Sequence, residues 1–204
     1  MKLTIKISTS RSNIDIDSNI FFKDNIGEYD KYSFSFFMSI GDNGSNIGEV
    51  KGRVFDEREI LNDGEDLVYI SDMYNQDVYS AIEKLIKSKV YKEELDEDLI
   101  FENPYLCYID RVYIEPKYRK LGIAKYIFKN LYTILLHTLM IHIRCFVIYP
   151  QPQVRTEERW VDQEDPNNVM KKVMTKVIKN AGYRVIGRNS GYYAINCMTG
   201  NERI

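Results

Sequence analysis

A short basic turn between a predicted strand and a predicted helix could bind a phosphate group. Arg119, Gly122 and Ala124 form the pattern Arg-x-x-Gly-x-Ala, directly before an apolar segment that ends at Leu139. Glycine lets the backbone approach a ligand closely, and alanine is small enough not to block it. The first N–H groups of a helix lack intrahelical partners and favour an anion. The turn therefore predicts a pyrophosphate site, and an ordinary strand–helix turn with basic neighbours is the alternative.

Strands are predicted on both sides of this turn and its helix. Residues 106–114 are rich in β-branched and aromatic side chains, and residues 141–149 form a second such segment that ends before Pro150. A helix between two strands lets them lie parallel, with a right-handed crossover. The turn matches neither the Walker A pattern nor the dinucleotide-binding Gly-x-Gly-x-x-Gly pattern, which argues against both of those nucleotide sites.

The first of these strands changes phase near its middle. Cys107 and Ile109 are apolar at odd positions, whereas Val112 and Ile114 are apolar at even positions. Both pairs can face one core only if an extra residue is inserted between them, which predicts a β-bulge near Asp110. The alternative is a strand that is buried on both faces, for which phase has no meaning.

The strand end and the turn together resemble the coenzyme motif of the GNAT superfamily, the acyl-CoA-dependent N-acyltransferases. The match covers residues 112–118 and the turn, and the order of the predicted elements extends it weakly from Tyr32 to the C-terminus. The resemblance implies an α/β (α+β) fold with a mixed central sheet of about seven strands and helices on both faces. The fourth and fifth strands would be parallel and splayed at the bulge, so that the pantetheine arm enters between them.

The resemblance also implies acetyl-CoA as co-substrate, with no metal. The residues expected to bind acetyl-CoA lie on the strand end, in the turn and at the start of the last helix; they are Val112, Tyr113, Ile114, Arg119, Lys120, Leu121, Gly122, Ile123, Ala124 and Asn168. Asn167 is the rival of Asn168 for contact with pantetheine.

The implied reaction is direct attack of a primary amine on the thioester, with backbone N–H groups near the bulge stabilising the oxyanion. Asp110 is the first candidate for the base that takes the amine proton, because it lies at the predicted bulge. Glu115 and Glu49 are weaker candidates. The alternative role for Asp110 is an ion pair with Arg111 or a lysine of the turn.

The acid that protonates the leaving thiolate is harder to assign. Many family members carry a tyrosine four residues before the glycine that ends the last helix, and this chain has Ile178 there. Tyr192 is the first candidate, with Tyr183, Tyr193 or water as alternatives. His137, His142 and Cys107 fit core or surface positions better than catalytic ones.

The remaining sequence completes one domain over residues 1–204. Strands are expected at residues 3–8, 33–40, 47–55, 183–187 and 192–197. A helix is expected from Ser71 or Asp72 to Lys89, and the last helix runs from the cap Asp165-Pro166 to Gly182. Residues 56–66 and 151–164 are expected as loops. Residues 56–102 resemble an insertion before the fourth strand, either a lid or side wall of the acceptor site or a packing element.

Composition limits the class of protein and its partners. Residues 1–102 hold 22 acidic and 12 basic side chains, and residues 103–204 hold 8 acidic and 16 basic. A basic half would suit a polyanionic coenzyme and an acidic half a cationic acceptor, unless the two are simply solvated surfaces of opposite sign. Sixteen tyrosines without a basic–aromatic repeat argue against nucleic acid.

Cysteine usage and hydropathy indicate a cytoplasmic protein. The three cysteines have no metal or disulfide spacing. Residues 131–149 are apolar but contain Arg144, so a helix end followed by a strand explains them better than a membrane span. The sequence does not decide between a monomer and a homodimer.

Two functions fit these features. The first is an N-acetyltransferase that acts on an amine-bearing small molecule or protein. The second is a non-catalytic acyl-CoA-binding or protein-interaction module that keeps the fold. Ile178 favours the second slightly, and the intact turn fits both.

Overall fold

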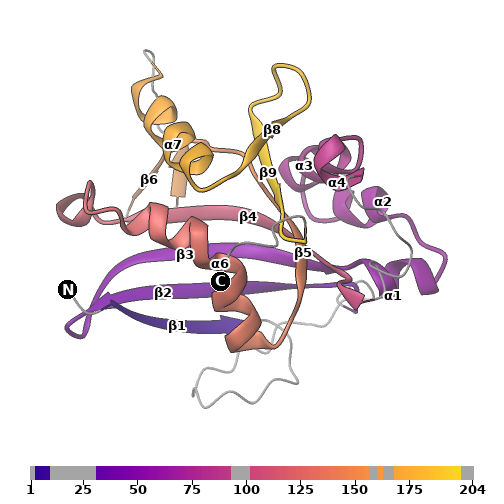
Figure 1. The fold of residues 1–204 in the computed structure, drawn as a ribbon, viewed down its shortest axis with the longest axis horizontal. Helices are drawn as coiled ribbons and strands as arrows, with labels where there is room; N and C mark the ends of the chain where they lie inside the picture. Colours follow the sequence, from indigo (N-terminus) through magenta and orange to yellow (C-terminus); the bar gives the residue numbers. More distant parts are fainter. Residues whose placement is uncertain (1–2, 10–30, 93–101, 157–159, 163–167, 199–204) are drawn as a thin grey trace.

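The computed structural model describes residues 3–9, 31–92, 102–156, 160–162 and 168–198. Seven strands form one mixed sheet in the order β1-β2-β3-β4-β5-β9-β8, and only β4 and β5 pair in parallel (Figure 1). This confirms the expected sheet of about seven strands with a parallel fourth and fifth. Its strands are β1 (Leu3–Thr9), β2 (Ser33–Asp42), β3 (Ser45–Asp56), β4 (Tyr105–Ile114), β5 (Ile143–Ile148), β8 (Arg184–Ile186) and β9 (Tyr192–Asn196).

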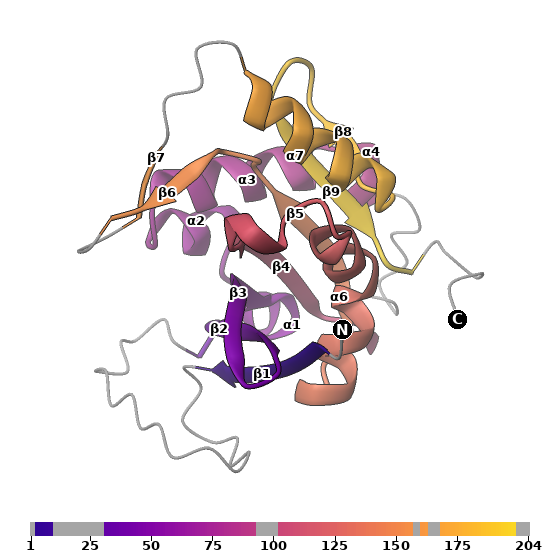
Figure 2. The same cartoon turned by 90° about the vertical axis from the view of Figure 1, so that its left-hand side faces the viewer.

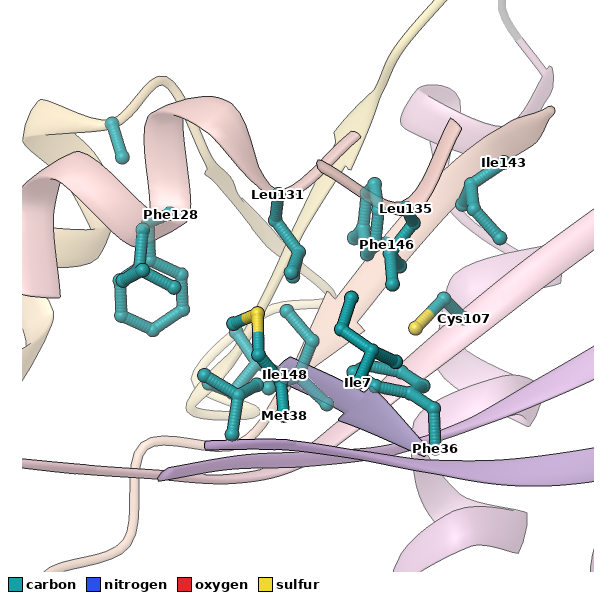
Figure 3. Close-up of a cluster of buried hydrophobic side chains, with 14 of the residues drawn as sticks. Ile7, Phe36, Met38, Cys107, Phe128, Leu131, Leu135, Ile143, Phe146 and Ile148 are labelled. Carbon is teal, nitrogen blue, oxygen red and sulfur yellow. The ribbon is translucent and has the colours of Figure 1, made fainter. Parts of the chain in front are cut away.

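One face of the sheet is covered by α6 (Ile123–Leu139), the helix that follows the basic turn, and by α7 (Val169–Asn180). Figure 3 shows Phe128, Leu131 and Leu135 of α6 facing side chains of the sheet. On α7 only Ile178 is fully buried, although its sequence carries a longer apolar stripe. The predicted end of this helix at Gly182 is confirmed, while its predicted cap at residues 165–166 lies outside the described residues.

The opposite face is covered by helices from the segment that precedes β4 (Figure 2). They are α1 (Glu57–Asn62), α2 (Leu67–Asp72), α3 (Gln76–Ile86) and α4 (Lys89–Lys92). Val78, Ile82 and Leu85 of α3 are buried in one cluster with side chains of β4, β5 and β9. The described helices of this segment therefore contribute side chains to the core.

Two predictions for this segment were wrong. Residues 56–66 were expected as a loop, but the Asp56 carboxylate accepts a hydrogen bond from the Glu59 backbone and caps α1. Acidic side chains stabilise the first turn of a helix. The acid-rich composition of residues 56–66 therefore indicated the starts of helices. The single helix expected from residue 71 or 72 is divided, because Asn75 caps a new helix through the N–H groups of Asp77 and Val78.

The segment after β5 also differs from the prediction. The loop expected over residues 151–164 contains a hairpin of β6 (Gln153–Arg155) and β7 (Trp160–Asp162). The apolar residues 131–149 are divided into the end of α6 and the buried strand β5, as expected. No helix in the described part of the chain is long and apolar enough to span a bilayer.

A buried ion pair joins the helical segment to the sheet. Arg144 on β5 pairs with Glu57, the first residue of α1, and the two side chains are only 3% and 4% exposed. The Tyr91 hydroxyl of α4 also donates to Glu57, and the Arg144 guanidinium lies 4.4 Å from the Tyr91 ring centroid. This group holds both ends of the helical segment against β5.

Removing one partner of this pair is expected to destabilise the fold. Glu57→Gln would leave the Arg144 charge buried without its counter-ion, at a cost of about 3–5 kcal/mol in the free energy of unfolding. Urea unfolding measures this loss. The matched control is Glu83→Gln, which breaks an exposed pair with Lys87 on α3 and should change stability little. Equal losses in the two variants would contradict a stabilising role for the buried pair.

Candidate active site

The predicted bulge is present in β4. Lys51 of β3 pairs with Arg111, and the next residue, Gly52, pairs with Ile109, so Asp110 is the extra residue. This extra residue causes the change of apolar phase in the sequence, because Ile109 before the bulge and Val112 after it both contact the cluster under α6. The predicted position of the bulge is confirmed.

Gly52 explains why the strands can come together at this point. A Cβ atom on Gly52 would lie 2.5 Å from a ring carbon of Phe36 and 2.8 Å from the backbone oxygen of Tyr108. Both distances are far below van der Waals contact, and the second involves backbone that cannot move aside. A side chain here would therefore push β3 away from β4 at the bulge.

The two parallel strands stop pairing at the bulge. Their last pair is Ile109 with Ile148, whereas β4 continues to Ile114 without a β5 partner. Asp110 on one strand and Tyr149 after the other therefore flank the point where the strands separate. Beyond this point, β4 has an edge that faces away from β3 and carries backbone N–H and C=O groups. In the described part of the chain, no other strand pairs with this edge. Val112 lies on this edge.

The basic turn lies between the end of β4 and α6. Gly122 is the N-cap of α6 with a left-handed backbone, φ +82°, which glycine adopts without strain. A Cβ on Gly122 would meet nothing within 4 Å, so the space beside it is open. The first hydrogen bond of α6 runs from the Tyr126 N–H to the Gly122 carbonyl, which leaves the preceding N–H groups without intrahelical partners. The turn can accept an anion through these groups.

The neighbouring residues of the turn divide into exposed and buried ones. Lys120 and Leu121 are exposed, and Lys120 also has a left-handed backbone. Ile123 is buried in the core and Ala124 packs against it, so these two would meet a ligand through backbone atoms.

Arg119 has a structural contact as well as an exposed charge. Its Nε donates to the Ile114 carbonyl at 2.9 Å, which ties the turn to the end of β4. Its guanidinium lies 5.8 Å from the Tyr113 ring centroid. The remaining N–H groups on an exposed side chain can reach a phosphate.

Arg119→Ala is expected to weaken coenzyme binding and to flatten its dependence on salt. The charge of an exposed side chain is screened by salt, whereas the backbone contacts of the turn largely persist. Titration calorimetry with CoA at several ionic strengths measures both effects. Arg119→Lys, which keeps the charge but cannot reproduce the planar guanidinium contact with β4, is the control. An unchanged slope in Arg119→Ala would show that Arg119 does not pair with the coenzyme.

A group of charged side chains lies at the bulge, on the face of the sheet opposite α6. Arg111 pairs with Glu49 at 3.3 Å and with Asp110 at 3.7 Å, and Lys51 lies 3.6 Å from Asp110. The Arg111 guanidinium also lies 4.3 Å from the Trp160 ring centroid, so β7 covers this group. Glu49 and Asp110 are thus brought together at the bulge, but both carboxylates are paired with cations.

Glu115, the other candidate base, lies outside this group. It comes after the end of β4 and pairs with Lys117 at 3.6 Å. The ion pair between Asp110 and Arg111 is the alternative role expected for Asp110 from the sequence. Trp160 contributes to the site without having been predicted, because it lies in a segment that was expected to be a loop.

The candidate acids occupy different surroundings. Tyr192 starts β9 beneath α3 and is 7% exposed. Burial is the main influence on the pKa of Tyr192 and raises it, while a hydrogen bond with Ser80 acts in the opposite direction. Tyr183 and Tyr193 are buried on the α6 face of the sheet, and burial raises the pKa of Tyr183 well above its ordinary value. All three phenols therefore lie largely inside the protein.

Asn168 and α7 border a basic hollow. Asn168 is the exposed N-cap of α7, with a left-handed backbone and no side-chain cap, and its rival Asn167 lies outside the described residues. A hollow of about 540 Å³ runs along this helix. It is lined by Asn168, Lys171, Lys172, Thr175, Lys176, Lys179 and Asn180. The lysines make this hollow suitable for an anionic ligand.

No protein-family model matches the chain, and no curated protein matches its sequence. Two solved N-acetyltransferases resemble it in structure. An agmatine N-acetyltransferase in its apo form has a TM-score of 0.38 at 10% identity, over 78% of this chain and 73% of its own. A Drosophila melanogaster polyamine N-acetyltransferase, which forms N-acetylagmatine, has the same score and identity over 78% of this chain and 74% of its own.

Proposed function

We propose that this protein transfers an acetyl group from acetyl-CoA to a primary amine by direct attack in a ternary complex. The observation that carries the proposal is the separation of β4 from β5 at the Asp110 bulge. The turn at Gly122, beside which the space is open, follows the end of the same strand β4. The turn would hold the pyrophosphate, and the thioester would lie against the free edge of β4. Residues 1–204 would act as one domain, with residues 56–102 as its insertion.

The reaction needs an uncharged amine. An amine with a pKa near ~10 is almost fully protonated at neutral pH, and deprotonating it costs about 4 kcal/mol. Asp110 stands at the bulge and is the proposed acceptor of this proton. Backbone N–H groups on the free edge of β4, Val112 among them, would stabilise the oxyanion as the amine attacks.

A covalent route through a cysteine is disfavoured. Cys107 is the cysteine of β4, and its burial raises the pKa of its thiol well above the ordinary value. The thiolate is the nucleophilic form of cysteine, so a thiol held neutral in the core cannot accept the acetyl group readily. This supports direct transfer to the amine.

The second candidate function is a non-catalytic acyl-CoA-binding module. Ile178 favours it, because a buried isoleucine that is 1% exposed stands where the family acid is expected. The pairing of Asp110 with two cations also fits a purely structural bulge.

Thiol release from acetyl-CoA over a panel of amines separates the two functions. The panel should include polyamines, amino acids, aminoglycosides and peptides with free N-termini or lysines. An enzyme would release CoA thiol with at least one amine, together with an equal amount of N-acetylated product. Saturable CoA binding without thiol release for any amine would support the binding module instead.

A further inference from the structure

We infer that Tyr149, positioned by Lys171, is the residue that protonates the leaving thiolate. This inference rests on the proposed acetyl transfer. Tyr149 directly follows β5 and its last pair with β4, so it lies across the strand separation from Asp110. An acid on one strand and a base on the other would then stand on the two sides of the thioester.

The backbone and ring of Tyr149 are held in place. The Gln151 N–H donates to the Tyr149 carbonyl at 2.9 Å, which closes a tight turn after the strand. The ring centroid lies 4.8 Å from that of Tyr192, and a Cβ on Gly191 would lie 2.8 Å from the Tyr149 ring carbon Cε2. A catalytic group needs this kind of fixed orientation.

The hydrogen bond with Lys171 determines which way the Tyr149 proton can go. Lys171 Nζ donates to the Tyr149 hydroxyl oxygen at 2.9 Å and lies 4.6 Å from the ring centroid. An ammonium group has no acceptor site, so the phenol cannot donate its own proton back to the lysine. Tyr149 is half-buried, and Lys171 does not engage its hydroxyl hydrogen.

The other candidate phenol is less accessible. Tyr192 is 7% exposed and is buried in the cluster under α3. Its ring also supports that of Tyr149 from the side of the helical segment. Tyr192 is therefore better placed to hold the acid than to act as one.

The acetyl transfer forms a C–N bond and breaks the C–S bond. Asp110 first takes one proton from the ammonium and passes it to solvent. The uncharged amine nitrogen then forms a bond to the thioester carbon and releases its second proton to Asp110, which returns it to solvent. The C–S bond breaks, its electron pair goes to sulfur, and the Tyr149 proton is transferred to that sulfur to give CoA thiol. The resulting phenolate is stabilised by the Lys171 ammonium and regains a proton from solvent.

Tyr149→Phe tests the assignment, because it keeps the ring and removes only the hydroxyl. With acetyl-CoA and an amine that the wild-type protein acetylates, kcat should fall by about 10²-fold while the Kd for acetyl-CoA stays unchanged. Lys171→Met should lower kcat, and Lys171→Arg should restore most of it, since a cation is retained. Tyr132→Phe, which removes an exposed hydroxyl 3.3 Å from His142, is the control and should not change kcat.

Four outcomes would overturn the assignment. Wild-type turnover that persists in Tyr149→Phe would overturn it and leave the proposed function intact. A large loss in Tyr192→Phe with none in Tyr149→Phe would transfer the role to Tyr192. A wild-type protein without turnover would overturn the proposed function and this assignment together. If Tyr149→Phe unfolds, equal kcat in Lys171→Met and Lys171→Arg would overturn the inference.

Discussion

Gly122→Glu is expected to abolish CoA binding. The Gly122 side-chain direction is open, with nothing within 4 Å of a built Cβ, so a glutamate carboxylate would project into the space proposed for the pyrophosphate. The two negative charges would repel each other at close range, where screening by salt is weak. The backbone at φ +82° would also become strained with a side chain present. Titration calorimetry with CoA would then record no saturable heat.

Gly64→Glu is the matched control for this experiment. Gly64 follows α1, has φ +72°, and also has nothing within 4 Å of a built Cβ. The variant therefore introduces the same charge and a similar backbone strain at a position outside the turn. It should bind CoA as the wild-type protein does. Undiminished affinity in Gly122→Glu would remove the turn from the coenzyme site.

Asp110→Asn is expected to lower turnover by about 10²–10⁴-fold, while the affinity for acetyl-CoA stays unchanged. The substitution keeps the shape of the side chain and removes the charge that would accept the amine proton. The remaining rate should rise with pH, because free amine would then come from solution. The side chain is 39% exposed and its pairs with Lys51 and Arg111 are 3.6 and 3.7 Å long, so the fold should tolerate the change.

Asp63→Asn provides the control for Asp110. Asp63 is 40% exposed and pairs with Lys31 at the end of α1, so its loss removes a comparable surface ion pair and should leave turnover unchanged. Wild-type turnover and an unaltered pH profile in Asp110→Asn would exclude Asp110 as the base. Glu49, which shares Arg111 with it, would then be the next residue to test. Unfolding of Asp110→Asn would instead indicate that Asp110 anchors the bulge.

Local sequence signals predicted the elements that frame the site. The change of apolar phase between Ile109 and Val112 was sufficient to place the bulge, because strand periodicity is a property of neighbouring residues. The left-handed N-cap at Gly122 agrees with the glycine of the turn motif. These features are set by backbone geometry over a few residues, and so they can be read from the chain itself.

Contacts between distant segments could not be predicted in the same way. Lys171 and Tyr149 are 22 residues apart, and only the packing of α7 beside the end of β5 brings them together. Trp160 meets Arg111 because a hairpin forms within a polar segment whose strands are only three residues long. The acid-rich segment before β4 was misjudged for a related reason, since composition does not distinguish a capping aspartate from a loop aspartate.

The measurement that tests the central claim most directly is acetyl transfer from isotopically labelled acetyl-CoA to an amine, followed by mass spectrometry of the product. The wild-type protein and Gly64→Glu should both form the labelled N-acetyl amine, and Gly122→Glu should form none. This result would join the activity to the turn before α6 in a single assay. Equal product from all three proteins would contradict the coenzyme site proposed here, and no product from any of them over the whole amine panel would contradict the proposed enzyme.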